Sequence, residues 1–181
     1  MFRWGIITLF LISVSSEAAL VPNAMPRQPG KDFTRDGLFE GGVDQGANLE
    51  DVRFAKHSPN PFERWVIDFS DAQRNVGAQA PKYQLRYETS EKLSLPDGTD
   101  QLKRPARFLF IFRSIQANHV TVEKLKNLVK KSAFVKDIVL YPPIERGDMA
   151  MEFILSQDVK FTPHQPSMKE GRVVLDLKSL Q

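Results

Sequence analysis

Two segments that lie far apart in this chain share one strand pattern: arginine, a large apolar residue, valine, isoleucine or leucine, aspartate, then phenylalanine or leucine. Residues 64–70 read RWVIDFS, and residues 172–178 read RVVLDLK. Successive side chains of a β-strand point to opposite faces. In the first segment Trp65, Ile67 and Phe69 therefore share one face, and Arg64, Val66, Asp68 and Ser70 share the other; the second segment divides in the same way. The repeat predicts a β-layer that packs on one side and contacts water on the other.

Further segments follow the same alternation. Residues 107–113 (RFLFIFR) place three phenylalanines on one face, and residues 82–88 and 135–141 also read as strands. Residues 121–132 differ, because Val122, Leu125 and Leu128 recur at helical spacing. The pattern predicts a mainly β domain of about eight strands with one short amphipathic helix at about 121–132. The lysine-rich side of this helix is expected to face solvent, with an anion-binding surface as the alternative.

The N-terminus has the pattern of a secretory signal peptide. Arg3 provides positive charge, residues 4–14 form an apolar run, and Ser16 and Ala18 supply small residues at the −3 and −1 positions of a cleavage site after Ala18. The apolar run is shorter than the roughly 20 residues that a membrane-spanning helix requires. We expect residues 1–18 to be removed and the protein to be periplasmic or secreted, without a stable membrane anchor; an uncleaved anchor is the alternative. The chain has no cysteine, which suits a bacterial envelope protein better than a small disulfide-stabilised extracellular module.

Residues 19–47 are rich in proline and glycine. Such a segment has little apolar surface to bury, so we expect a flexible arm ahead of a folded domain at 48–179. The alternative is a binding tail in which Phe33, Leu38 and Phe39 fold onto a partner.

The two repeat strands, together with residues 49–54 (LEDVRF) and 151–161, resemble the AMIN domain. That family is a β-sandwich of two similar halves. It is found in bacterial periplasmic proteins, beside N-acetylmuramoyl-L-alanine amidase domains and in secretin pilots, where it binds peptidoglycan and localises the protein. The resemblance therefore implies a β-sandwich and a peptidoglycan-binding or localising role.

No catalytic pattern is found in the sequence. The three histidines, His57, His119 and His164, have no metal-ligand spacing around them, and the chain lacks a nucleophile elbow, a phosphate-binding loop and a dinucleotide fingerprint. Asp68 and Asp176 could act as paired carboxylates of a glycan hydrolase. Ion pairs with arginines on the same strand or on the neighbouring strand are the simpler interpretation. We expect a protein that is not an enzyme and that uses no cofactor or metal.

The expected function is therefore binding. The leading hypothesis is an exported cell-envelope module that recognises peptidoglycan or an envelope protein through an exposed sheet face. The alternative is a periplasmic assembly partner of a secretion or pilus machine, which would use sheet edges or the N-terminal arm. A third possibility, a carrier of a small apolar ligand, rests only on the thirteen phenylalanines, which suit an ordinary core.

Guanidinium groups suit the carboxylates of peptidoglycan stem peptides. The residues expected to bind the ligand are Arg64, Arg107, Arg113 and Arg172. The net charge of +3 is too small to indicate a nucleic-acid partner. The sequence does not determine the oligomeric state.

Overall fold

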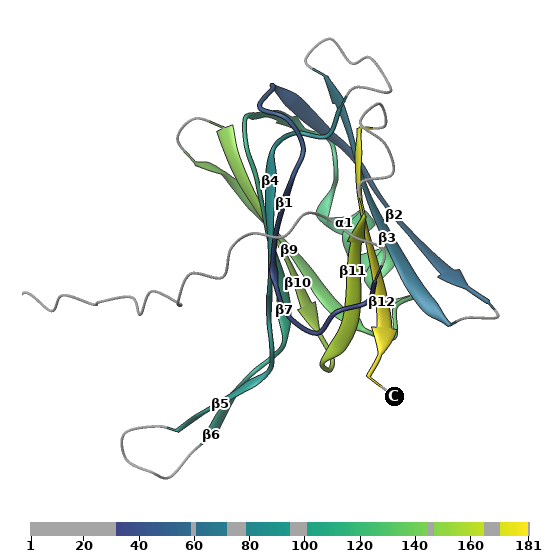
Figure 1. Ribbon diagram of the computed structural model, residues 1–181. Coiled ribbons are helices and arrows are strands. Elements are labelled where there is room, and N and C mark those ends of the chain that lie inside the picture. Colours follow the sequence, from purple (N-terminus) through teal and green to yellow (C-terminus); the bar gives the residue numbers. More distant parts are fainter. Residues whose placement is uncertain are drawn as a thin grey trace, which may run out of the picture.

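The computed structural model describes residues 32–58, 61–71, 79–94, 101–144, 147–164 and 171–180. These residues form two five-stranded sheets that pack face to face as a β-sandwich, one short two-stranded ribbon and one helix (Figure 1). The predicted fold class is therefore confirmed. The predicted signal peptide at 1–18 lies outside the described residues. Among the described residues, no helix is long and apolar enough to cross a membrane.

The first sheet, which we call sheet A, has the strand order β1-β4-β7-β10-β9, and all of its neighbouring strands are antiparallel. Its strands are β1 (Leu38–Gly41), β4 (Tyr83–Glu88), β7 (Arg107–Phe112), β9 (Val135–Ile144) and β10 (Asp148–Leu155). The ribbon of β5 (Glu91–Ser94) and β6 (Gln101–Arg104) extends β4 and β7 away from the sandwich (Figure 1).

The second sheet, sheet B, has the order β11-β12-β3-β2-β8. Its strands are β2 (Ala47–His57), β3 (Phe62–Asp71), β8 (Ile115–Asn118), β11 (Val159–His164) and β12 (Arg172–Ser179). Only β8 runs parallel to its neighbour.

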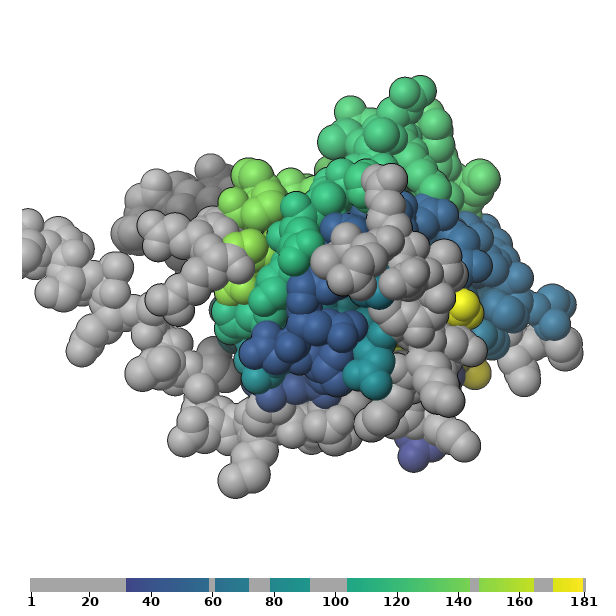
Figure 2. Space-filling model, turned by 90° about the horizontal axis from the view of Figure 1, so that it is seen from above, coloured from purple at the N-terminus to yellow at the C-terminus, as the bar shows by residue number. Residues whose placement is uncertain are grey.

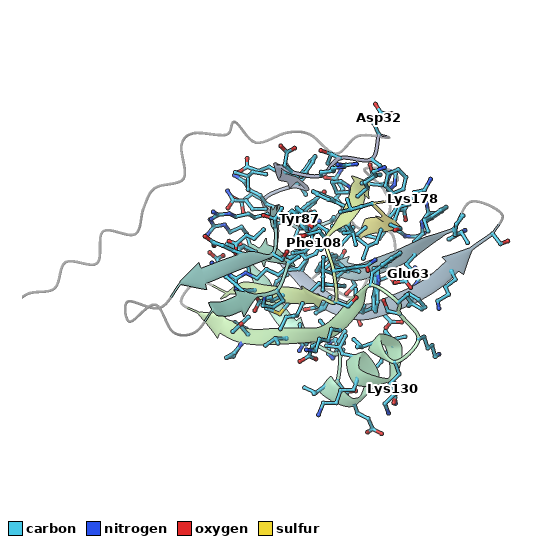
Figure 3. The ribbon with its side chains drawn as sticks, turned by 90° about the horizontal axis from the view of Figure 1, so that it is seen from below. Asp32, Glu63, Tyr87, Phe108, Lys130 and Lys178 are labelled. Atoms are coloured by element: carbon cyan, nitrogen blue, oxygen red, sulfur yellow. The ribbon has the colours of Figure 1, made fainter. Side chains whose placement is uncertain are left out.

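The core between the two sheets is aromatic. Trp65 of sheet B meets Phe153 of sheet A with ring centroids 5.4 Å apart, and Phe69 meets Phe112 at 5.0 Å. The inward faces predicted for both repeat strands and for 107–113 are confirmed, because their apolar alternate residues are buried. Phe108 lies in this interior, between the two layers (Figure 3).

Each open side of the sandwich is bridged by one segment of chain. On one side Thr34 exchanges two backbone hydrogen bonds of 2.8 Å with Phe161 of β11, and four residues later β1 begins at the edge of sheet A. On the other side α1 (Val122–Val129) connects β8 to β9 and buries Leu125. Figure 2 shows the β1 segment and α1 on opposite sides of the molecule.

The predicted helix is confirmed as α1, and Thr121 is its N-cap. The Thr121 hydroxyl accepts a hydrogen bond from the backbone N–H of Lys124 at 3.2 Å. Beyond the helix, Glu63 of β3 accepts hydrogen bonds from the Ser132 hydroxyl and the Ala133 N–H. Figure 3 shows Glu63 close to the helix, whose labelled Lys130 points away from the sandwich.

Two local predictions differ from the structure. Residues 19–47 were expected to be a flexible arm, but the described part, 32–47, contains β1, because Leu38 to Gly41 pair with β4 and Phe39 is buried. The stretch 135–141 was expected to stop before Pro142, but β9 continues to Ile144. Proline lacks the N–H that a central strand needs, and β9 tolerates two prolines because it is the edge of sheet A.

Candidate binding face

The two repeat strands are neighbours in sheet B. β3 and β12 pair antiparallel with Val66 opposite Val174. Since the repeats run in opposite directions, the arginine of each lies opposite the aspartate of the other: Arg64 opposite Asp176, and Arg172 opposite Asp68. All four side chains lie on the face of sheet B that points away from the core.

Arg64 and Asp176 form the tighter of the two pairs. The guanidinium donates two hydrogen bonds, from Nε to Oδ1 and from Nη2 to Oδ2, each 2.7 Å long. His164 of β11 lies with its Nε2 2.8 Å from Oδ2 of the same carboxylate. Asp176 is 3% exposed, and this burial acts to raise the pKa of its carboxyl group. The hydrogen bonds from Arg64 and His164 have the opposite effect and outweigh burial, so the pKa of Asp176 is lowered.

Asp68 also has two basic partners, but here the neighbouring strand of the hairpin supplies the closer one. Arg53 of β2 donates from Nε to Oδ2 at 2.6 Å and from Nη2 to Oδ1 at 2.8 Å. Arg172 Nε lies 3.8 Å from Oδ1. Arg53 stands opposite Val66 of β3, just as His164 stands opposite Val174 of β12. Each repeat aspartate therefore contacts two basic side chains. One is the arginine of the other repeat strand. The other, Arg53 or His164, comes from the strand that forms a hairpin with the strand of the aspartate.

We call this set the paired-strand face; it comprises Arg53, Arg64, Asp68, His164, Arg172 and Asp176. Its three arginines and two aspartates sum to +3 − 2 = +1 with the histidine neutral. The arginine side chains are 52%, 37% and 40% exposed in chain order, whereas the Asp176 side chain is 4% exposed. The anions thus lie deeper than the cations, and the guanidinium groups form the solvent-facing layer.

An aromatic cluster adjoins this face at the start of β3. The ring of Phe62 stacks on His57 at a centroid distance of 4.3 Å, and the Arg64 guanidinium carbon lies 5.3 Å from the Phe62 centroid. Phe33, 39% exposed, meets the same ring edge-on at 6.5 Å. Arg64 is consequently held both by the Asp176 carboxylate and by the Phe62 ring.

The structure separates the four arginines predicted to bind the ligand. Arg64 and Arg172 lie together on the paired-strand face. Arg107 and Arg113 lie on the outer face of sheet A, where Arg107 donates to Glu88 and Glu152 at 2.7 Å each and Arg113 pairs with Asp148. All four therefore have carboxylate partners within the chain, and they divide into two pairs, one on the outer face of each sheet.

The cross-strand ion pairs considered for Asp68 and Asp176 are present: Arg64 pairs with Asp176, and Arg172 pairs with Asp68. Sequence reasoning missed Arg53 and His164. Their roles depend on how β2 and β11 align with the repeat strands, and a bulge between Leu49 and Asp51 shifts the alignment of β2. His164 is the last residue of β11.

Within the described ranges, no group of three histidine, cysteine, aspartate or glutamate side chains could hold a metal ion. No protein-family model matches the chain, and no curated protein matches it either.

Proposed function

We propose that this protein is a non-catalytic, exported module of the bacterial cell envelope that binds peptidoglycan through the paired-strand face. The observation that carries the proposal is the doubled cluster itself, in which two buried or half-buried aspartates hold arginines toward solvent in defined positions. Guanidinium groups bind carboxylates in a planar, two-point geometry, and stem peptides of peptidoglycan carry such carboxylates.

The spacing of the clusters suits a ligand with more than one anionic group. Arg64 and Arg172 mark opposite ends of the paired segment, four register positions apart. At about 3.4 Å per residue the two clusters lie about 14 Å from one another along the strands. A polymer with repeated carboxylates could contact both clusters, and two weak contacts on one rigid sheet would reinforce each other.

The resemblance of the repeat strands to the AMIN domain supports the same function. Two of the segments that carry the resemblance, residues 64–70 and 172–178, also carry four of the six residues of the paired-strand face. The proposal therefore assigns the role of that family to a particular surface of this chain.

The alternative is a protein partner that adds a strand to a sheet edge. The edge strands β11 and β9 are poorly suited to this role. At the β11 edge Thr34 already pairs with Phe161, and Pro163 has no N–H to offer. At the β9 edge the Asp137 carboxylate accepts the Ile138 N–H at 2.9 Å, and Pro142 and Pro143 follow.

Co-sedimentation with purified sacculi tests the proposal. We expect the purified protein to pellet with sacculi, to pellet less when the peptidoglycan carboxylates have been converted to amides, and to pellet less with Arg172→Ala. Protein that stays in the supernatant with untreated sacculi would contradict the proposal, and equal binding to amidated sacculi would contradict carboxylate recognition.

A further inference from the structure

The cations of this protein differ in whether a carboxylate holds them. The four arginines predicted to bind the ligand all have carboxylate partners, and Lys124 of α1 pairs with Asp51. Among the described residues, four exposed lysines of α1 and of the segment that follows it have no carboxylate partner: Lys126, Lys130, Lys131 and Lys136. We call these four residues the lysine surface.

Positive charge is concentrated in this part of the chain. Residues 122–137 contain five lysines and two acidic residues, so the segment has a net charge of +3. The whole chain also has a net charge of +3. All other residues together are therefore neutral, and the excess charge of the protein lies at α1 and the start of β9.

The carboxylates near α1 do not cancel this charge. Asp51 is paired with Lys124, and Glu63 is buried, where it accepts two hydrogen bonds from the turn after the helix. Glu123 lies in the first turn of α1, where a carboxylate suits the positive end of the helix dipole. Asp137 accepts the N–H of its neighbour in β9. The solvent-facing side of the helix is therefore cationic.

α1 carries part of this charge on a projecting stripe. Residues four apart on a helix are neighbours, so Val122, Lys126 and Lys130 lie along one stripe. Val122 is 59% exposed, whereas Leu125 of the same helix is buried in the core. Figure 2 shows α1 projecting from the sandwich, and Figure 3 shows Lys130 pointing away from it. The exposed stripe combines one apolar side chain with two cations.

We propose that α1 is a peripheral docking element through which the protein binds the surface of a membrane that contains anionic phospholipids. Each lysine close to such a surface strengthens binding by roughly fivefold. Lipids diffuse within the membrane, so anionic headgroups can gather beneath lysines that no neighbouring carboxylate holds in place. The lysine surface therefore needs no preformed pocket to bind them.

A membrane suits this surface better than a soluble anionic polymer. A chain of phosphate groups would contact the lysines and leave Val122 in water, whereas the membrane interface accepts an apolar side chain beside cations. The apolar side of α1 is already used in the core through Leu125, so the helix has no wide apolar face to insert. Binding is therefore electrostatic, reversible and sensitive to salt.

Docking through α1 leaves the paired-strand face open. α1 lies at one side of the sandwich, where it connects β8 to β9, whereas the paired-strand face is on the outer face of sheet B. A protein held in this way could bind a second ligand at the same time. The docking itself does not depend on what the paired-strand face binds.

Co-sedimentation with lipid vesicles tests the proposal. We expect the purified protein to bind vesicles in which about a third of the lipid is phosphatidylglycerol, and not vesicles of phosphatidylcholine alone. Binding is expected to be lost as the NaCl concentration rises from about 50 to about 500 mM.

Two matched double variants locate the docking element. Lys126→Glu/Lys130→Glu is expected to weaken vesicle binding by about tenfold or more, because two contributing lysines are reversed. Lys82→Glu/Lys160→Glu changes the net charge equally beside β4 and in β11, far from β8 and β9 in the strand order, and is expected to retain most of the binding. Thermal melts establish that both variants are folded.

Val122→Trp gives a second readout, because indole favours the membrane interface. We expect this variant to bind the anionic vesicles more tightly than the wild type and to bind soluble polyphosphate no better. A protein that does not bind the anionic vesicles at low salt overturns the proposal, and binding of polyphosphate would then assign the lysines to a soluble polymer. An equal loss in the two double variants also overturns it, because net charge alone would then explain the binding.

Discussion

Arg64 and Asp176 are separated by 112 residues in the chain and lie directly opposite each other on β3 and β12, joined by two hydrogen bonds of 2.7 Å. The pair connects the two repeat strands, and it therefore links an early strand of the domain to its last strand. His164 makes the same carboxylate the meeting point of three strands.

Replacing Asp176 with asparagine is expected to destabilise the fold by about 1–3 kcal/mol, because a buried acceptor of three hydrogen bonds would lose its charge. Urea denaturation measures this change. Asp68→Asn is the matched control, since the Asp68 side chain is 21% exposed and its pairs are worth about 1 kcal/mol or less. An equal loss of stability in both variants would contradict the expectation that the buried Arg64–Asp176 pair stabilises the fold more than the pairs of Asp68.

The acid stability of the protein should depend on Asp176. Its pKa is lowered in the folded state, so its stabilising contribution is present above the unfolded pKa of about 3.9 and is lost as the pH falls through the folded pKa. We expect the urea midpoint of the wild type to fall more steeply than that of Asp176→Asn below about pH 4. Parallel curves from pH 2 to 6 would show that the lowered pKa does not contribute to stability.

Gly42→Ala is expected to be strongly destabilising, by about 2–4 kcal/mol. Gly42 has a φ of +76°, and a Cβ built there would lie 2.0 Å from the carbonyl oxygen of Pro81, which the backbone cannot easily move. Gly46→Ala is the control, because its Cβ would meet only the end of the flexible Gln116 side chain. Thermal melts of the two variants compare them directly, and a smaller loss for Gly42→Ala than for Gly46→Ala would contradict this account.

Thr121→Ala should cost about 1 kcal/mol, because the Thr121 hydroxyl is the N-cap of α1. Thr121→Ser keeps the hydroxyl and is expected to retain most of the stability. Equal losses in both variants would show that the methyl group, and not the cap, matters at this position.

Much of the fold followed from side-chain alternation. The core-facing residues of β3, β7 and β12 were predicted correctly because burial against the other sheet leaves a period of two in the sequence. The outer face of β12, predicted to contact water, is instead buried at Val174 and Asp176. β1 was missed because four residues between glycines carry too little pattern. β9 can include Pro142 and Pro143 because it is an edge strand of sheet A. Its edge position follows from the order of strands in the sheet, which the local sequence does not show.

Only part of the candidate site could be predicted, because its ion pairs depend on which strands are neighbours and how they are aligned. The repeat identified Arg64, Asp68, Arg172 and Asp176 as outward-facing, but which arginine meets which aspartate depends on β3 and β12 being antiparallel neighbours. Arg107 also flanks an alternating strand, yet it belongs to the other sheet, and nothing in its local sequence distinguishes the two cases. Arg53 and His164 required the register of two further strands.

The most direct test of the paired-strand face compares two matched arginine pairs in co-sedimentation with sacculi. Arg64→Ala/Arg172→Ala removes arginines of the paired-strand face, and Arg107→Ala/Arg113→Ala removes the same number from the outer face of sheet A. We predict at least a tenfold loss of binding for the first variant and little change for the second, which corresponds to about 1.4 kcal/mol or more. Equal binding by both variants, or a loss confined to the sheet A variant, would contradict the assignment of the binding face.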